Sequence, residues 1–526
     1  MQRALGFQNA KTAVSAARQA FAKGDLSTAE QICKAVLARA PDTGGVWTVL
    51  TETALARGRL DAAIVSAKRA VALLPRDPIA HILQAKCLFL AGEAGGALAA
   101  AERASKLVGQ SAEALDALGA IFGLLGLHER ALDLCRRAAA ARPIVSQYLF
   151  NLAATERMMG SLEAAETHAD AAISADRRYC LAHYLRADLR VQTAERNHIA
   201  EIEALIREAG LPASGEVLLR FALAKELEDI EQHGRAFDEV GAACVLQRRL
   251  IAYDARREYD HIDQVIRVQT RDWLASRPIA TCPADPIFVV GLPRTGTTLV
   301  ERILASHSAL ASAGESGAFA AELHRATQAA PDNPDFSAVG RRYVDAVTTF
   351  RVPPERRIVD KTLQNYLYCG MILAALPRAK IILVRRHPLD AGWAMLKAHF
   401  QGKFLFSYDQ TELADYILAY RRLARHWKAT LPPHAFMDVN YEDIVRDQAE
   451  QSRRLIAFVG LPWEDGVLRF HDSTAPSATA SAVQVRRPIY TSSVGKWRHH
   501  AGRLKPMCTR LAREIPASEL TPESLL

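Results

Sequence analysis

The chain has 526 residues, of which 49% are hydrophobic and 24% are charged, and its 66 Lys and Arg outnumber the 58 Asp and Glu to give a net charge of +8. This length is too great for one ordinary domain, so we expect two or three. No apolar run reaches the roughly 18 residues of a membrane span, and no block of like charges indicates a nucleic-acid-binding arm. The modest positive charge suits an anionic ligand.

The N-terminal segment MQRALGFQNAKTAVSAARQAFAKGD has the pattern of an amphipathic helix and lacks the continuous apolar stretch of a secretory signal. The eight cysteines are scattered without a CxxC pair. Scattered cysteines are typical of buried, reduced thiols rather than of a disulfide framework or a zinc site. We therefore expect a cytoplasmic protein without a metal site.

The first third of the chain repeats with a period of 34 residues. Glycine recurs at Gly24, Gly58, Gly92, Gly126 and Gly160, and alanine follows five residues later at Ala29, Ala63, Ala97, Ala131 and Ala165. Glycine suits a tight turn between two helices, a small alanine lets the helices approach closely, and prolines such as Pro41 and Pro75 end the second helix. The pattern resembles the tetratricopeptide repeat. Residues 1–177 are therefore predicted to form an all-α solenoid of about five repeats, in preference to a non-repeating alanine-rich bundle.

The register fades after residue 177. Ala194 occupies the next glycine position, although helical patterning continues beyond it. We expect residues 178–280 to form degenerate or capping helices and a connector. The proline-rich segment SRPIATCPADP (276–286) marks the boundary of a second domain.

From residue 286 onward, short apolar runs alternate with helical patterns. Strands are predicted at IFVV (287–290), RIVD (357–360), KIILVRR (380–386) and within AFMDVNYEDIV (435–445). Alternation of this kind predicts an α/β domain with a central parallel sheet, which we place at residues 285–510. A polar segment, 511–526, is expected to form a tail.

The segment GLPRTGTT (291–298) joins the first strand to a helix and resembles a phosphate-binding P-loop in which Thr297 replaces the usual lysine. Backbone N–H groups, the helix N-terminus and the threonine hydroxyls suit an anion. Arg294 adds a guanidinium inside the loop, whereas VRR rather than an acidic residue ends the 380–386 strand. These features disfavour magnesium-dependent ATP hydrolysis, although a glycine-rich turn that binds nothing stays an alternative.

Five stretches together resemble the sulfotransferase family: PIFVVGLPRTGTTLVERILASHS, VDKTLQNY, IILVRRHPLDAGW, VNYEDIV and SAVQVRRPIYTSSVGKW. The resemblance is greatest to the bacterial type with tetratricopeptide repeats, which is related to protein-tyrosine sulfotransferases. It implies that 3′-phosphoadenosine 5′-phosphosulfate is the donor and that no metal is used. The donor contacts that it implies are Arg294, Thr295, Gly296, Thr297 and Thr298 in the loop, Arg385 and Arg386 after the 380–386 strand, and Tyr441, Ser481 and Lys496.

The resemblance also implies the residues that carry the chemistry. Glu315, in SAGES, corresponds to the family's catalytic base, while Lys361 and Arg294 stabilise the transferring sulfuryl group. Taken without the family motifs, Glu315 and Lys361 would read as a surface carboxylate and a solvated charge. Two positions depart from the family pattern, because Ala394 replaces a serine and His387 replaces an acidic residue.

The predicted function is therefore sulfuryl transfer to a hydroxyl acceptor, with a tyrosine of a peptide or protein as one candidate. The repeats could hold a peptide or protein, or could form a homodimer. The departures at Ala394 and His387 leave one alternative open, a non-catalytic repeat scaffold with a silent sulfotransferase fold. A P-loop kinase is a third possibility.

Overall fold

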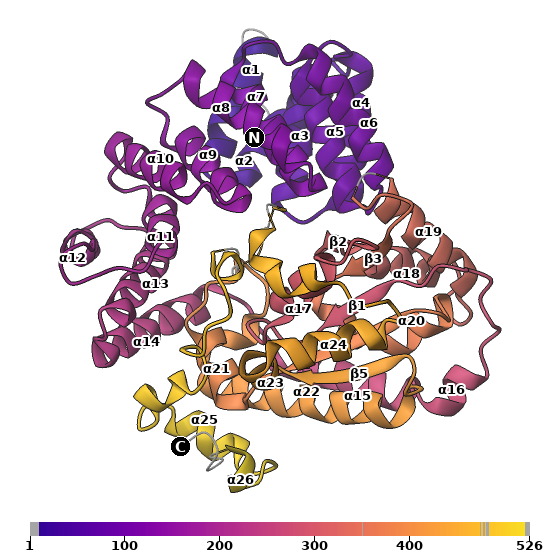
Figure 1. Cartoon of the computed structure of the whole chain (residues 1–526). Helices are drawn as coiled ribbons and strands as arrows, with labels where there is room; N and C mark the ends of the chain where they lie inside the picture. The colour runs from indigo at the N-terminus through magenta and orange to yellow at the C-terminus, as the bar shows by residue number, and fades with distance from the viewer. Residues whose placement is uncertain (1–9, 350, 474, 477–478, 480–482, 521–526) are drawn as a thin grey trace. The chain divides into compact units, whose positions relative to one another are not determined.

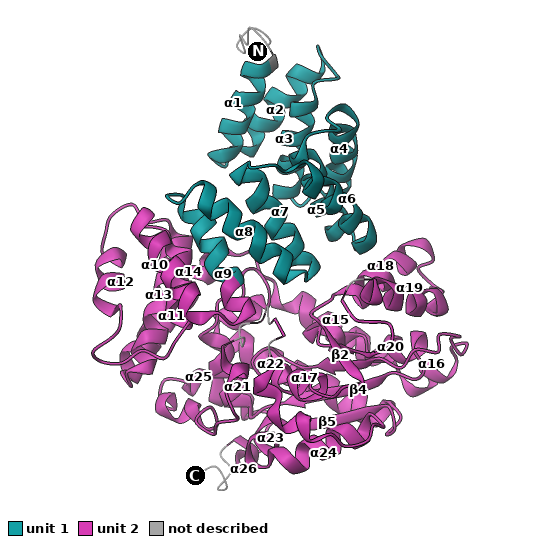
Figure 2. Cartoon of the chain, turned by 45° about the horizontal axis from the view of Figure 1, so that its top comes forward, with its two compact units in different colours: residues 1–155 teal, residues 156–526 magenta. Residues whose placement is uncertain are grey.

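The computed structural model describes residues 10–349, 351–473, 475–476, 479 and 483–520 (Figure 1). The chain divides into two compact units, Met1–Thr155 and Glu156–Leu526, coloured teal and magenta in Figure 2. Each unit is considered by itself below.

The first unit is built from helix pairs. The described helices are α1 (Ala10–Ala22), α2 (Leu26–Leu37), α3 (Gly44–Ala56), α4 (Leu60–Leu73), α5 (Pro78–Leu90), α6 (Ala94–Leu107), α7 (Ala112–Leu125), α8 (His128–Ala141) and α9 (Ser146–Met159), whose last turn belongs to the second unit. The five register glycines all have positive φ, between 69° and 90°, and end or follow the first helix of a pair. The five register alanines are at most 2% exposed. The predicted 34-residue helix–turn–helix repeat is therefore confirmed.

The second unit begins with further helices. They are α10 (Leu162–Ala175), α11 (Cys180–Asp188), α12 (Ile199–Ile206), α13 (Ala213–Asp229), α14 (His233–Leu250), α15 (Ala255–Val268) and α16 (Arg271–Ala275). Apolar residues of α13, α14 and α15, such as Phe221, Val240 and Ile262, join the same hydrophobic core as Phe288 of the sheet. Helices α13, α14 and α15 thus share the core of the α/β unit, although residues 178–280 were expected to form degenerate or capping helices and a connector.

The described residues contain a five-stranded parallel sheet with the order β2-β3-β1-β4-β5. The strands are β1 (Ile287–Val290), β2 (Leu310–Gly314), β3 (Arg357–Asp360), β4 (Lys380–Arg385) and β5 (Phe436–Asn440). The predicted central parallel sheet is confirmed. β2 has the sequence LASAG, which lacks β-branched and aromatic residues and therefore gave no strand signal.

Helices cover both faces of the sheet. Along β1, Ile287 and Val289 pack with α17 (Thr297–Ala305) and α24 (Gln448–Phe458), whereas Phe288 and Val290 pack with the opposite helical layer. Side chains alternate across a strand, so a strand that is apolar at every position must be buried on both faces. The opposite layer includes α18 (Ala318–Ala329), α19 (Phe336–Thr348), α20 (Cys369–Ala375), α21 (Pro388–Leu396) and α22 (Gln410–Thr430).

The C-terminal part continues through α23 (Tyr441–Arg446), several 3₁₀ turns, α25 (Lys505–Leu511) and α26 (Ala517–Leu520). Leu511, Ile515 and Leu520 are buried in the core of the second unit. The described part of the segment 511–526 is therefore packed against the domain. None of the described helices is long and apolar enough to span a bilayer. All eight cysteines are described and are free thiols.

Candidate functional site: a basic cleft at the carboxyl edge of the sheet

The loop after β1 is held tightly in place. A Cβ on Gly291 would lie 2.7 Å from the Val384 carbonyl oxygen, so only glycine lets the loop leave the sheet there. Thr295 is buried, and its hydroxyl donates to the Leu292 carbonyl at 2.7 Å, which closes the loop on itself. Arg294 has a φ of 64°, an uncommon conformation for a residue with a side chain. The backbone is thus wrapped as the P-loop pattern predicts.

Gly296 and Tyr441 approach each other closely. Gly296 has a φ of 98°, and a Cβ there would lie 2.4 Å from Cδ2 of Tyr441. Thr297 and Thr298 follow as the buried first residues of α17. Gly296, Thr297 and Thr298 line the cleft, so the positive N-terminal end of α17 lies at the cleft, an arrangement that attracts anions.

The ends of β2 and β3 bring Glu315 and Lys361 together. Lys361 Nζ donates to Glu315 Oε1 at 2.6 Å, and the Lys361 side chain is only 1% exposed. Beneath them, the Asp360 carboxylate accepts from Ser316 Oγ at 2.6 Å and from the Thr362 N–H at 2.8 Å. These bonds tie the two strand ends to each other, so the carboxylate and the ammonium are held side by side.

Two arginines stand at the end of β4: Arg386 lines the cleft, whereas Arg385 does not. Arg386 Nη1 donates to the Arg294 carbonyl at 2.9 Å, and its guanidinium lies 4.9 Å from the ring centre of Tyr441, at the end of β5. Arg386 Nε is buried without a hydrogen-bond partner among the described residues. Arg385 instead pairs with Asp438 of β5 at 2.8 Å and does not line the cleft.

Asp390 positions Lys496. Its carboxylate accepts from the Gly495 N–H at 2.6 Å and from the Trp497 N–H at 3.1 Å, so the backbone on both sides of Lys496 is anchored to α21. The motif IILVRRHPLDAGW contains Asp390, but no spacing in the sequence links it to a segment 105 positions away. The predicted contact Ser481 lies outside the described residues.

Of the two residues that depart from the family pattern, Ala394 lines the cleft and His387 does not. The His387 ring is hydrogen-bonded to the Leu520 carbonyl at 2.9 Å and stacked on Trp497. Burial lowers the pKa of His387. Its backbone N–H donates to Glu442 at 2.8 Å, so a carboxylate is present at this corner although residue 387 itself is not acidic.

These strand ends enclose one cleft of about 260 Å³. Of the predicted residues, the following line it: Arg294, Gly296, Thr297, Thr298, Glu315, Lys361, Arg386, Tyr441 and Lys496. Lys397, Lys403 and Arg487 also line it and were not predicted. The excess of cations over carboxylates makes the cleft suited to a ligand that carries several negative charges. No group of three or more potential metal-ligating side chains occurs among the described residues.

Glu228 of α13 is another residue that the sequence did not reveal. It accepts from Trp393 Nε1 at 3.1 Å and pairs with Lys397. Burial disfavours the charged form of Glu228, but the attraction of Lys397 and Lys496 outweighs this effect and lowers the pKa of Glu228 to about 2. Helix α13, which lies outside the family motifs, thus supplies in Glu228 a counter-charge to Lys397.

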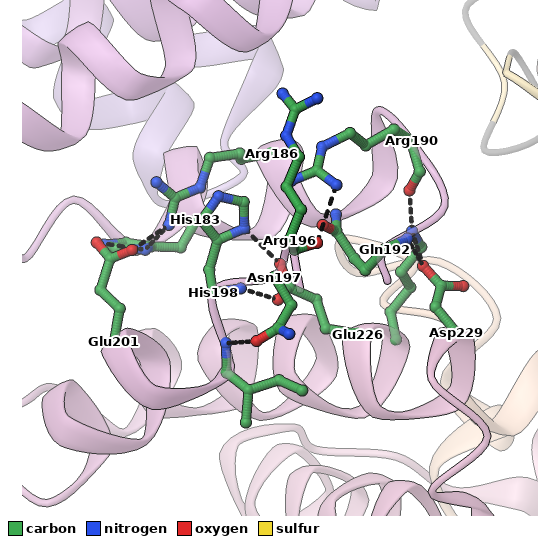
Figure 3. A network of polar contacts seen from close by, with 12 residues as sticks. His183, Arg186, Arg190, Gln192, Arg196, Asn197, His198, Glu201, Glu226 and Asp229 are labelled. Atoms are coloured by element: carbon green, nitrogen blue, oxygen red, sulfur yellow. Dashed lines mark hydrogen bonds and ion pairs between the residues drawn. The ribbon is translucent and has the colours of Figure 1, made fainter. Parts of the chain in front are cut away.

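The end of α13 is held by a polar network, which Figure 3 shows. In this network Glu226 contacts His198 at 2.9 Å.

The parallel sheet, the glycine-rich loop at its carboxyl edge and the basic cleft define an α/β domain whose cleft is suited to anionic ligands. Residues 286–465 match the model of the sulfotransferase family, and residues 20–87 match that of the tetratricopeptide repeat. The chain therefore contains a sulfotransferase-family domain preceded by tetratricopeptide repeats.

Among curated proteins, an uncharacterized protein of Aquifex aeolicus (strain VF5) is 31% identical over 330 residues. The match covers 59% of this chain and 43% of that relative, so this chain spans less than half of the relative's length. Among solved structures, a thermophilic TPR protein from Thermus thermophilus matches at 19% identity and a TM-score of 0.31, over 34% of this chain and 97% of that one. Pseudomonas aeruginosa pilF matches at 20% identity and a TM-score of 0.31, over 39% and 91% respectively.

Proposed function

We propose that the second unit transfers the sulfuryl group of 3′-phosphoadenosine 5′-phosphosulfate to a hydroxyl acceptor, with a tyrosine of a peptide or protein as the acceptor. The observation that carries the proposal is the convergence of Arg294, Lys361 and Glu315 from three strand ends on one cleft. The coarser statement, that residues 286–465 are a sulfotransferase-family domain, supports it.

The residues of the cleft fit such a donor. The close approach of Tyr441 to Gly296 gives an aromatic face beside the anion-binding loop. Arg386 Nε is a buried hydrogen-bond donor without a partner among the described residues. A phosphate oxygen would satisfy that group, whose burial without a partner is costly. Lys496, Arg386 and the loop would share the two phosphate groups of the donor. Ala394 removes one hydroxyl contact, which costs about 1 kcal/mol of affinity when the arginine contacts remain.

The donor supplies a sulfur atom whose bond to the phosphate oxygen breaks while a new bond to the acceptor oxygen forms. In our proposal, Glu315 takes the proton that the acceptor hydroxyl loses. Lys361 and Arg294 stabilise the negative charge that shifts toward the bridging oxygen, because fixed cations in a cleft need no reorganisation during the reaction. The distance of 2.6 Å between Lys361 Nζ and Glu315 Oε1 supports this pairing of the proposed base with the cation.

Titration calorimetry with 3′-phosphoadenosine 5′-phosphate, the expected product, tests the proposal. We expect a dissociation constant in the range of about 1–100 μM, and no binding below about 1 mM would contradict it. Magnesium-dependent binding of ATP instead would indicate a P-loop kinase. Binding of the product without transfer to any acceptor would indicate a silent sulfotransferase fold.

Labelled donor incubated with a cell lysate and the protein would identify the acceptor. Label in protein that survives as sulfotyrosine after digestion is the expected result, whereas label confined to glycans or small molecules would refute the tyrosine acceptor. We further propose that the repeats bind the peptide or protein, that the chain forms a homodimer and that it acts in the cytoplasm. Light scattering of the purified chain tests the dimer directly.

A further inference from the structure

The turn between α9 and α10 contacts a segment that lines the cleft. Arg486 belongs to the 3₁₀ turn η4 (Gln484–Arg486), and its Nη2 donates to the Met158 carbonyl at 3.0 Å. A Cβ on Gly160 would lie 2.4 Å from Cζ of Arg486 and 2.5 Å from its Nη1. The guanidinium therefore lies directly on Gly160, in space that any side chain would occupy. All these residues belong to the second unit.

The same 3₁₀ turn contacts the anion-binding loop. Gln484 Oε1 accepts from Nη2 of Arg294 at 3.1 Å. Gln484 and its neighbours Val485 and Arg487 line the cleft. A three-residue 3₁₀ turn has few hydrogen bonds of its own, so its position depends on the contacts that its side chains make.

A second arginine, Arg302, contacts a segment that Arg486 also contacts. Arg302 of α17 is buried, and its Nη2 donates to the carbonyls of Ala475 at 2.9 Å and Pro476 at 2.7 Å. Arg486 Nη2 also reaches the Ala475 carbonyl, at 3.4 Å. The helix that follows the anion-binding loop and the α9–α10 turn are thus joined through one carbonyl group.

We propose that Arg486 is a positioning residue, which anchors the 484–486 turn on Met158 and Gly160 and thereby holds Gln484 against Arg294. The proposal rests on the proposed function, since it assigns Arg294 to the transferring group. In this proposal the turn between α9 and α10 supports sulfuryl transfer, in addition to any role of the repeats in binding a partner.

Gly160→Ala in the full chain tests the anchor, with Gly58→Ala as the matched control. Both glycines occupy the same repeat position with positive φ, 90° and 69°, so both variants incur similar turn strain. A Cβ on Gly58 meets nothing within 4 Å, whereas a Cβ on Gly160 displaces Arg486. We expect hydrogen–deuterium exchange of residues 483–490 to become at least about threefold faster in Gly160→Ala and to stay unchanged in Gly58→Ala. The same exchange rates in both variants would overturn the proposal.

Kinetics of sulfuryl transfer test the link to Arg294. We expect Arg486→Ala to lower kcat/KM by about 10- to 100-fold, because a small displacement of a group that stabilises the transition state is costly. Gly160→Ala should add no further loss in the Arg486→Ala background, as expected for residues that act through one contact. Gln484→Ala, which leaves the anchor intact, should lower kcat/KM similarly. Additive losses for Gly160→Ala and Arg486→Ala would overturn the proposal.

The proposed function and the positioning role of Arg486 can fail separately. If the wild type does not bind 3′-phosphoadenosine 5′-phosphate, the proposed function fails while the exchange experiment still decides whether Arg486 anchors the turn. If the wild type binds and transfers but Arg486→Ala does so equally well, only the positioning role fails.

Discussion

In the first unit each helix packs mainly on a helix that is close in the chain, whereas the cleft of the second unit joins residues as far apart as Arg294 and Gln484, which are 190 positions apart. The repeats are held by small apolar residues such as Ala63, which is 0% exposed and lets α4 approach α3. The cleft is held by charges such as Lys361, which is buried and needs its partner Glu315. A substitution in the first unit should therefore act locally, and one in the cleft should act on its distant partners.

The strongest test of the cleft side of this comparison is Glu315→Gln. Loss of a general base should reduce the transfer rate by about 10²- to 10⁴-fold, because a neutral amide cannot take up the proton that the substrate hydroxyl loses. The affinity for 3′-phosphoadenosine 5′-phosphate, measured by calorimetry, should change little. An equal loss of binding and transfer would instead show that Glu315 serves to hold Lys361.

Glu228→Gln tests whether a helix outside the family motifs supports the cleft. Removing this carboxylate leaves Lys397, whose side chain is 23% exposed, without its partner, so we expect the free energy of unfolding at pH 7 to fall by about 1–3 kcal/mol. Denaturant titration of Glu195→Gln, which alters an exposed glutamate, should show almost no change.

The same pair predicts a pH dependence. The pKa of Glu228 is lowered from 4.5 to about 2, so the folded state holds fewer protons than the unfolded chain in this interval. Its stabilising effect is present above about pH 4.5 and is lost as the pH falls through about 2. The difference in stability between wild type and Glu228→Gln should shrink over this interval. A constant difference down to pH 2 would contradict the ion pair.

On the repeat side, Ala63→Leu inserts a larger side chain into a closely packed helix pair and should destabilise the chain by about 1–3 kcal/mol. Ala62→Leu, at the neighbouring exposed position of α4, is the control and should cost little. Thermal unfolding measures both. If Ala63→Leu also changed the kinetics of sulfuryl transfer, the contrast between a local repeat and a long-range cleft would not hold.

The smallest effect concerns helix capping in the repeats. Ser111 Oγ accepts from the Ala114 N–H at 3.3 Å at the start of α7, whereas the Ser161 side chain makes no such bond at the start of α10. Ser111→Ala should therefore reduce stability by about 1 kcal/mol. Ser161→Ala should be nearly neutral by the same denaturant titration, and equal losses would refute this reading of the caps.

The sequence was sufficient for the parts of the fold that depend on short-range patterns. The 34-residue register predicted the helix pairs, since turn glycines and closely packed alanines recur at fixed spacing. The strands IFVV and RIVD were found at their observed bounds, because buried parallel strands are continuous apolar runs. LASAG was missed as a strand, since its small residues carry no strand propensity and only pairing with β3 makes it one.

The tertiary structure decided which residues share the cleft. The motifs placed Arg294, Lys361 and Arg386 on separate strand ends, and the strand order brings those ends to one edge. Arg385 is separated from Arg386 by the alternation of side chains and pairs with Asp438. Glu228, Asp390 and Arg486 each contact a segment more than 100 positions away, which for Arg486 is a repeat turn. A sequence specifies its short-range periodicities directly, but contacts between distant segments exist only once the core has set how those segments pack.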